Sequence, residues 1–213
     1  EPTVMTEGLG SHWYAAYGSF KIFPACRWLA CALECMLYIR QATGWNPDDI
    51  ATVRVYSFPR LVNDMMDTRP QTMTDAQFSL PWTLAMVAAG IPAGADWYSE
   101  QTLQNSDYQA LAGRVTASVD KELTARMEGA ARQPGARVEV THRNGETFSH
   151  QQMIPSGSAE RPLLEPQILV KARQNLHAAP GKGEELIRRI MQGNSHVRYC
   201  SAAGLNGSDS NLF

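Results

Sequence analysis

The feature that most constrains this fold is a long apolar segment, residues 25–42. Four polar residues interrupt it: Arg27, Glu34, Arg40 and Gln41. Pro24 suits the first turn of a helix, and Gly44 suits the left-handed cap that ends one. A helix that is apolar almost all round is normally buried on more than one side. The sequence therefore predicts a helix enclosed by other elements, and 213 residues are enough to build a core around it.

The clearest strand signal lies in residues 137–153. Val138 and Val140 alternate with polar residues, and a second strand returns through Phe148. Asn144-Gly145 lies between the two and favours a type I′ turn. This segment therefore predicts a β-hairpin.

Other segments complete an α+β pattern. Residues 50–58 are rich in β-branched and aromatic side chains and predict a strand. Residues 75–89 predict a second apolar helix that ends at Gly90, with Asp75 at its cap or in its first turn. Weaker signals predict strands at 17–23 and 115–120 and closing helices at 162–176 and 184–192. This order predicts an α+β sheet domain followed by a helical segment.

Composition excludes several classes of function. The net charge is −2 without any block of like charges, so we expect neither nucleic-acid nor membrane binding. Apolar stretches are interrupted well before the ~20 residues that a membrane span needs. The first residues lack a basic segment leading into an apolar run, so we expect no signal peptide and a cytoplasmic location.

The chain has four cysteines, Cys26, Cys31, Cys35 and Cys200, and they allow two interpretations. Cys31 and Cys35 are four residues apart on the predicted helix and could share a face as a metal pair. Two thiolates are too few for a structural zinc site, however, and no further ligand follows at suitable spacing. We therefore interpret them as small buried side chains in a reducing cytosol, with no metal bound.

Three stretches resemble the MmgE/PrpD family, the 2-methylcitrate dehydratase type. Residues 20–27, F-K-I-F-P-A-C-R, resemble the family's K-x-(Y/F)-P-x-C. Residues 70–82, P-Q-T-M-T-D-A-Q-F-S-L-P-W, are similar to P-x-T-x-x-x-A-K-F-S-x-P-Y. The hairpin, followed by Pro162-Leu163 and Lys171, resembles a third conserved run. The resemblance covers most of residues 7–176 and keeps the family's order and approximate spacing.

The resemblance implies a domain arrangement. Residues 1–160 would form the smaller α+β lid domain, and residues 161–200 the C-terminal helices that pack on an all-helical domain. Residues 201–213 would form a flexible tail. Family members are about twice this length, and their helical domain comes first. We therefore expect a companion subunit that supplies the helical half, and a hetero-oligomer in which the two chains share one cleft.

The resemblance also implies the chemistry. Family enzymes eliminate water, release carbon dioxide or epimerise a centre beside a carboxylate, without metal or other cofactor. Such reactions need a base, and cations that stabilise developing negative charge. Lys21 matches the family's lysine and would clamp a carboxylate. Cys26 matches a Cys or His position and, near a helix N-terminus, would act as an acid or base or would simply line the cleft.

Three departures distinguish this chain from the family's pattern. Ala30 stands where many members have His, Trp82 where they have Tyr, and Gln77 where they have Lys. A Trp offers only an indole N–H in place of a hydroxyl that can donate and accept. We predict that Trp82 forms the cleft wall with Lys21 and Cys26, and that Gln77 and Ser79 contact substrate. His12 is a further candidate, whereas His142 and His150 are expected to be exposed strand residues.

Three functions remain open. In the first, the chain is the lid-bearing subunit of a two-chain lyase or isomerase that acts on a carboxylate. Alternatively, its cleft has been repurposed to cyclise or isomerise a larger apolar biosynthetic intermediate, as the three departures favour. The third function is non-catalytic, in which the chain stabilises an active paralogue.

Overall fold

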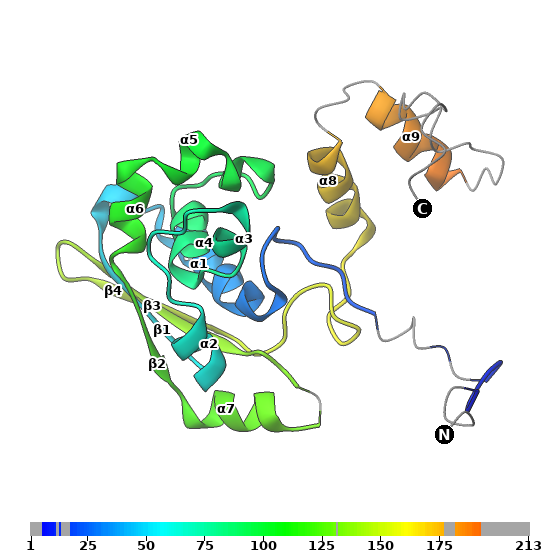
Figure 1. The fold of residues 1–213 in the computed structure, drawn as a ribbon, viewed down its shortest axis with the longest axis horizontal. Helices are drawn as coiled ribbons and strands as arrows, with labels where there is room; N and C mark the ends of the chain where they lie inside the picture. The colour runs from blue at the N-terminus through cyan, green and yellow to red at the C-terminus, as the bar shows by residue number, and fades with distance from the viewer. Residues whose placement is uncertain (1–5, 12, 14–17, 131, 177–181, 193–213) are drawn as a thin grey trace. The chain divides into compact units, whose positions relative to one another are not determined.

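The structure, a computed structural model, describes residues 6–11, 13, 18–130, 132–176 and 182–192. The chain forms two compact units, Glu1–Pro162 and Leu163–Phe213 (Figure 1). The predicted tail, residues 201–213, lies outside the described residues. Every helix in the described part of the chain is too short or too polar to span a lipid bilayer.

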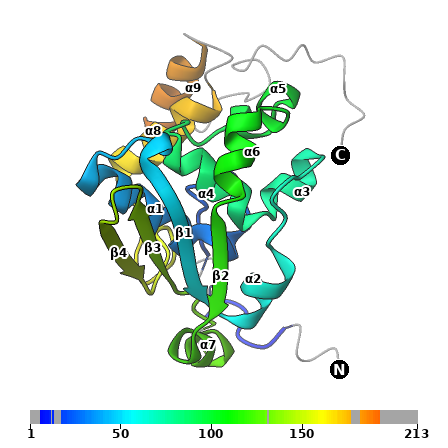
Figure 2. The same cartoon turned by 90° about the vertical axis from the view of Figure 1, so that its left-hand side faces the viewer.

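The first unit is built on one four-stranded sheet in the order β2-β1-β3-β4 (Figure 2). The antiparallel hairpin predicted near residue 145 is present as the β3–β4 pair, and β3 also pairs antiparallel with β1. β2 runs parallel to β1, so the sheet is mixed. The α+β class predicted from the sequence is confirmed. The strand bounds are β1 (Ile50–Ser57), β2 (Val115–Val119), β3 (Ala136–His142) and β4 (Thr147–Gln152).

One face of this sheet is apolar and the other is polar. Val53 on β1 pairs with Val140 on β3, and both are buried. Their neighbours Arg54 and Glu139 form a cross-strand ion pair at 3.5 Å on the opposite face. Strand side chains alternate between faces, so this register directs every valine of the two central strands to the same side. Helices can therefore cover that side alone.

Helix α1 (Ala30–Thr43) is the apolar helix predicted from the sequence. It begins later than expected, because the 3-10 turn η3 (Arg27–Leu29) precedes it. It ends as expected at Gly44, whose φ of 68° lets its N–H donate to the Arg40 carbonyl at 3.0 Å. The helix packs between β3 and β4 on one side and α4 (Leu80–Ala88) on the other. Its burial on more than one side is thus confirmed.

A long helical connection joins β1 to the parallel strand β2, as a parallel pair requires. The prediction of one helix over residues 75–89 is wrong, because the first helix ends before Phe78 and a second begins at Leu80. Thr72 and Asp75 form a capping box on the first piece, and Ser79 caps the second by accepting the Trp82 N–H at 3.0 Å. The connecting elements are α2 (Pro59–Asp64), α3 (Met73–Gln77), α4, η5 (Ala95–Tyr98), α5 (Glu100–Leu103) and α6 (Ser106–Ala112).

The hairpin turn differs from the predicted type I′ turn. The Gly145 N–H donates to the His142 carbonyl at 2.9 Å, and the His142 N–H donates to the Glu146 carbonyl at 2.8 Å. Gly145 has a φ of 94°, whereas Asn144 does not have the positive φ that a type I′ turn requires. The loop is therefore a three-residue turn with glycine at the left-handed position. Asn144 still stabilises it, by accepting the Glu146 N–H through its side chain.

The remaining helices close the two units. In the first unit, α7 (Lys121–Glu128) follows β2, and its N-terminus is capped by Asp120. In the second unit, α8 (Glu165–Asn175) and α9 (Lys182–Met191) confirm the two closing helices. An ion pair between Arg173 and Glu184 joins them at 2.7 Å. Packing of this unit on an all-helical domain stays a prediction.

A largely buried carboxylate joins α1 to the loop after β4. Glu34 is the one acid on α1, and its side chain is only 10% exposed. It accepts the Ser156 N–H at 2.7 Å and the Ser156 hydroxyl at 2.9 Å, and it pairs with Arg161. A buried charge needs such partners, because desolvation would otherwise destabilise it strongly.

We expect Glu34→Ala to lower the free energy of unfolding by about 2–3 kcal/mol, because it leaves two donors and a cation without their acceptor. Urea denaturation of the full chain measures this change. Glu139→Ala is the matched control, since its pair with Arg54 is largely exposed and should contribute less than about 1 kcal/mol. Equal effects of the two substitutions would contradict a special role for Glu34.

Candidate functional site

A pocket at the start of α1 brings together two of the predicted catalytic residues, Lys21 and Cys26. Lys21 is exposed and Cys26 is half-buried. The interior of the pocket measures about 10 Å³, room for roughly one water molecule. Its other principal lining residues are Phe20, Ile22, Arg27, Ala30 and Ser156.

The polypeptide that carries Lys21 and Cys26 is fixed by three contacts with the connection between β1 and β2. The Cys26 N–H donates to the Gln77 carbonyl at 2.8 Å. The Tyr98 hydroxyl donates to the Pro24 carbonyl. Phe23 stacks on Trp97 with ring centroids 6.2 Å apart. Residues 20–27 and 70–82, which resemble the family separately, are therefore in direct contact in the fold.

Residues 18–23 do not form the predicted strand in the part that the structure describes. The Phe20 N–H donates instead to the Gly157 carbonyl at 2.8 Å, outside the sheet. Gly157 has a φ of 84°, and a Cβ added there would lie 2.2 Å from the Phe20 carbonyl oxygen. Only glycine fits such a close approach in that conformation. Sequence reasoning missed this support, and the Ser156-Gly157 pair was the only local signal for a turn.

Trp82 does not lie on the wall of this pocket. Its side chain is fully buried in α4, and its indole N–H donates to the Trp97 carbonyl at 3.0 Å. The residue therefore packs the core behind the segment that carries Cys26. Its position beside Trp97 nevertheless connects it indirectly to Phe23.

Two of the predicted substrate-binding residues, Gln77 and Ser79, are not part of the pocket lining. Ser79 is fully buried, and its hydroxyl donates to the Asp67 carbonyl while capping α4. Gln77 is half-buried at the end of α3 and meets Cys26 through its backbone carbonyl. His12 lies outside the described residues. The structure thus groups Lys21 with Cys26 and gives Ser79 a capping role.

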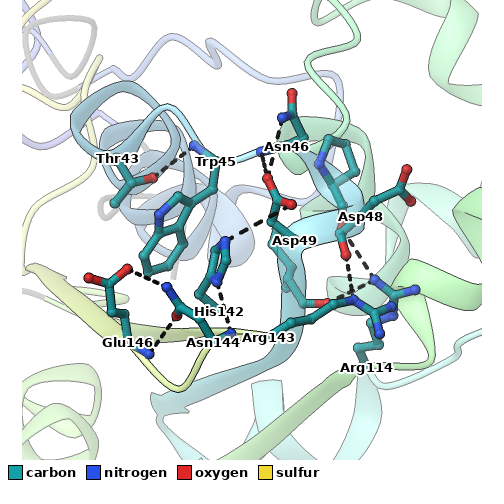
Figure 3. Close-up of polar contacts among 12 residues, drawn as sticks. Thr43, Trp45, Asn46, Asp48, Asp49, Arg114, His142, Arg143, Asn144 and Glu146 are labelled. Atoms are coloured by element: carbon teal, nitrogen blue, oxygen red, sulfur yellow. Dashed lines mark hydrogen bonds and ion pairs between the residues drawn. The ribbon is translucent and has the colours of Figure 1, made fainter.

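His142 belongs to a separate cluster at the hairpin tip (Figure 3). Its Nδ1 accepts the Asn144 N–H at 3.0 Å, and its Nε2 lies 4.0 Å from an Asp49 carboxylate oxygen. The ring packs on Trp45 with centroids 4.9 Å apart. Both ring nitrogens face local partners, so the cluster fixes the turn. The expected exposure of His142 is wrong, because its side chain is only 20% exposed.

The two cysteines of α1 are shielded from solvent and reagents by burial. Cys31 and Cys35 are fully buried, as the sequence predicts. Burial above all, and then the charge of Glu34, raises the pKa of Cys35 to about 12 and holds the pKa of Cys31 well above its ordinary value. No group of three or more metal-binding side chains occurs among the described residues. Cys26 is therefore the accessible thiol of this region.

We expect iodoacetamide at pH 8 to alkylate Cys26 well before Cys31 and Cys35. A thiol with a pKa of about 12 is ionised in only roughly one molecule in ten thousand at that pH, and the thiolate is the nucleophile. Peptide mass spectrometry over a time course measures each site. The same reaction in 6 M guanidinium is the control, where the three rates should converge. Early labelling of Cys35 in the folded chain would contradict this assignment.

We expect Gly157→Ala to displace residues 20–21 and to destabilise the chain by about 2 kcal/mol or more, because the added Cβ collides with the Phe20 carbonyl. Hydrogen exchange at the Phe20 amide reports the lost contact. Gly44→Ala is the matched control: it has a φ of 68° but nothing within 4 Å of the added Cβ. It should cost only about 1 kcal/mol and leave the Phe20 amide protected.

Comparison with known proteins gives one family. The family model described as the MmgE/PrpD C-terminal domain matches residues 23–196, well over half of the chain. The comparison of this chain with curated proteins finds no match. The matched range includes Cys26, Ala30 and the whole sheet, and Lys21 lies two residues before it.

Proposed function

Because the chain belongs to the MmgE/PrpD family, we propose that it is the lid-bearing subunit of a two-chain lyase or isomerase acting on a carboxylate substrate. The family is generally lyase- or dehydratase-like. The observation that carries the proposal is the shared pocket of Lys21 and Cys26. An ammonium group beside a thiol offers both charge stabilisation and a proton-transfer group in one place.

The roles of the pocket residues follow from their chemistry. Lys21 is exposed, so its ammonium can reach a carboxylate that enters from outside this chain. Arg27 adds a second positive charge to the same lining. Cys26 lines the same pocket, and its thiol exchanges a proton with the substrate or orients it. Together the two cations favour an anionic substrate and stabilise negative charge that develops next to its carboxylate.

A companion polypeptide supplies the opposite wall. A pocket with room for about one water cannot enclose a di- or tricarboxylate, so further residues must cover the substrate. Three large apolar side chains of segments 20–27 and 70–82 are also substantially exposed: Phe20 at 64%, Met73 at 55% and Phe78 at 49%. Exposed apolar groups of this kind favour association with another surface. The proposed companion is the helical half of the family enzymes.

A second candidate function is supported by Ala30, which lines the pocket with Lys21 and Cys26. Where many family members are expected to carry an imidazole, this chain presents a methyl group. Phe20 and Ile22 make the same lining more apolar. These residues favour a repurposed site that isomerises or cyclises a larger apolar intermediate carrying an anionic group. A chain that only stabilises an active paralogue is the non-catalytic alternative.

Replacing Lys21 by Ala in the complex with its companion should lower kcat/KM about 10²-fold, because one charge-stabilising group is lost at the reacting centre. Turnover of 2-methylcitrate and cis-aconitate is measured by loss of water or carbon dioxide. Lys121→Ala, on the exposed first turn of α7, is the matched control and should be neutral. Unchanged turnover in Lys21→Ala would remove this chain from the chemistry.

The same complex separates the two enzymatic candidates. Turnover of either acid supports the carboxylate lyase, whereas inertness toward both, in a complex that forms, supports the repurposed site. Native mass spectrometry measures the assembly directly. A monomeric chain that is active alone would contradict the need for a companion.

A further inference from the structure

A second and larger pocket includes Trp28, the middle residue of η3, in its lining. Its volume is about 310 Å³, within the range of small-molecule sites. Trp28, Phe58 and Pro59 form one part of its lining, and Met127, from the end of α7, forms another. It shares no lining residue with the pocket of Lys21 and Cys26. It is therefore a separate site in the fold.

The apolar part of this pocket is aromatic. Trp28 meets Phe58 edge to face, with ring centroids 5.9 Å apart and an interplanar angle of 87°. Phe58 is buried, whereas Trp28 is half-buried, and both line the pocket. Flat apolar groups pack well against such rings, and Met127 offers a deformable third side. The lining thus favours a ligand with a flat apolar body.

The rim of the pocket is mainly positive. Arg60 holds its guanidinium carbon 5.6 Å from the centre of the Trp28 ring. Its ion pair with Asp64 is long, at 3.5 Å, and both side chains are mostly exposed, so the pair is weak and Arg60 can turn toward a ligand. Arg132 is also exposed on the rim, and Glu128 is the one acid in the lining. An anionic group is favoured over a cationic one.

The backbone at Arg132 supplies an independent observation. Its φ is 44°, and it is the one non-glycine residue with a positive φ in the described part of the chain. A side chain as large as Arg rarely adopts this conformation, and such outliers occur preferentially at functional sites. Nearby, the Arg126 guanidinium donates to the Gln133 side chain at 2.6 Å, which supports the same turn. The strained turn directs a cation to the pocket rim.

We propose that this pocket binds a small aromatic carboxylate, with its ring against Trp28 and its carboxylate between Arg60 and Arg132. Two guanidinium groups can each donate paired hydrogen bonds to a carboxylate, and the ring fills the apolar side. The site is independent of the Lys21 pocket and of the proposed activity.

Calorimetry of the full 213-residue chain with 2-naphthoate tests this site, with neutral 2-naphthamide as the matched ligand. We expect saturable binding of 2-naphthoate and at least about tenfold weaker binding of the amide, because the amide lacks the charge that the arginines recognise. Saturation-transfer NMR checks that the naphthalene ring is in contact with protein. Absence of saturable binding, or equal affinity for both ligands, overturns the proposal.

Variants locate the site. Arg132→Asn removes the charge while Asn tolerates a positive φ, and Arg60→Gln removes the second charge at an exposed position. Each should raise the Kd of 2-naphthoate about tenfold. Arg54→Gln, an exposed arginine on the outer sheet face, and Lys21→Ala should leave it unchanged. If Arg132→Asn fails to fold, Arg60→Gln decides alone; an unchanged Kd in Arg60→Gln, or a loss in Lys21→Ala, overturns the proposal.

Discussion

Burial of α1 is the constraint on which the rest of the first unit depends. A helix with so little polar surface requires apolar partners on opposite sides, and the inner face of β3 and β4 and the helix α4 provide them. Its one acid, Glu34, is largely buried, so its carboxylate needs hydrogen-bond donors. The loop after β4 meets this need through Ser156 and Arg161. One helix thus sets the position of the sheet, of α4 and of the loop.

The Lys21 pocket is a consequence of this arrangement. The loop that satisfies Glu34 also presents Gly157 to Phe20, and the residue beside it, Ser156, lines the pocket. On the opposite flank, Tyr98 and Trp97 hold Pro24 and Phe23. The segment before α1 has no regular secondary structure of its own, so these side contacts give it its shape.

The departures from the family's pattern separate into two physical kinds. Ala30 lies in the pocket lining and changes the chemistry that the pocket can offer. Trp82 is buried, and its indole hydrogen bond joins α4 to Trp97. Gln77 is half-buried and is not part of that lining. A substitution at a buried position acts through packing and through the satisfaction of backbone groups, whereas one in the lining acts on a ligand directly. Of these three departures, Ala30 is therefore the one that a ligand in this pocket would contact directly.

The sequence by itself determined the buried helix, its end at Gly44, a strand beginning at residue 50, the hairpin and the two closing helices. Each of these depends on local periodicity and on the residues that end it. Local motifs also placed Lys21 and Cys26 in one segment. Only the tertiary structure decided the parallel pairing of β2, the burial of Trp82 and Ser79, and the close approach of Gly157 to Phe20. These features join residues far apart in the chain, and no local pattern records which distant backbone group will be the partner.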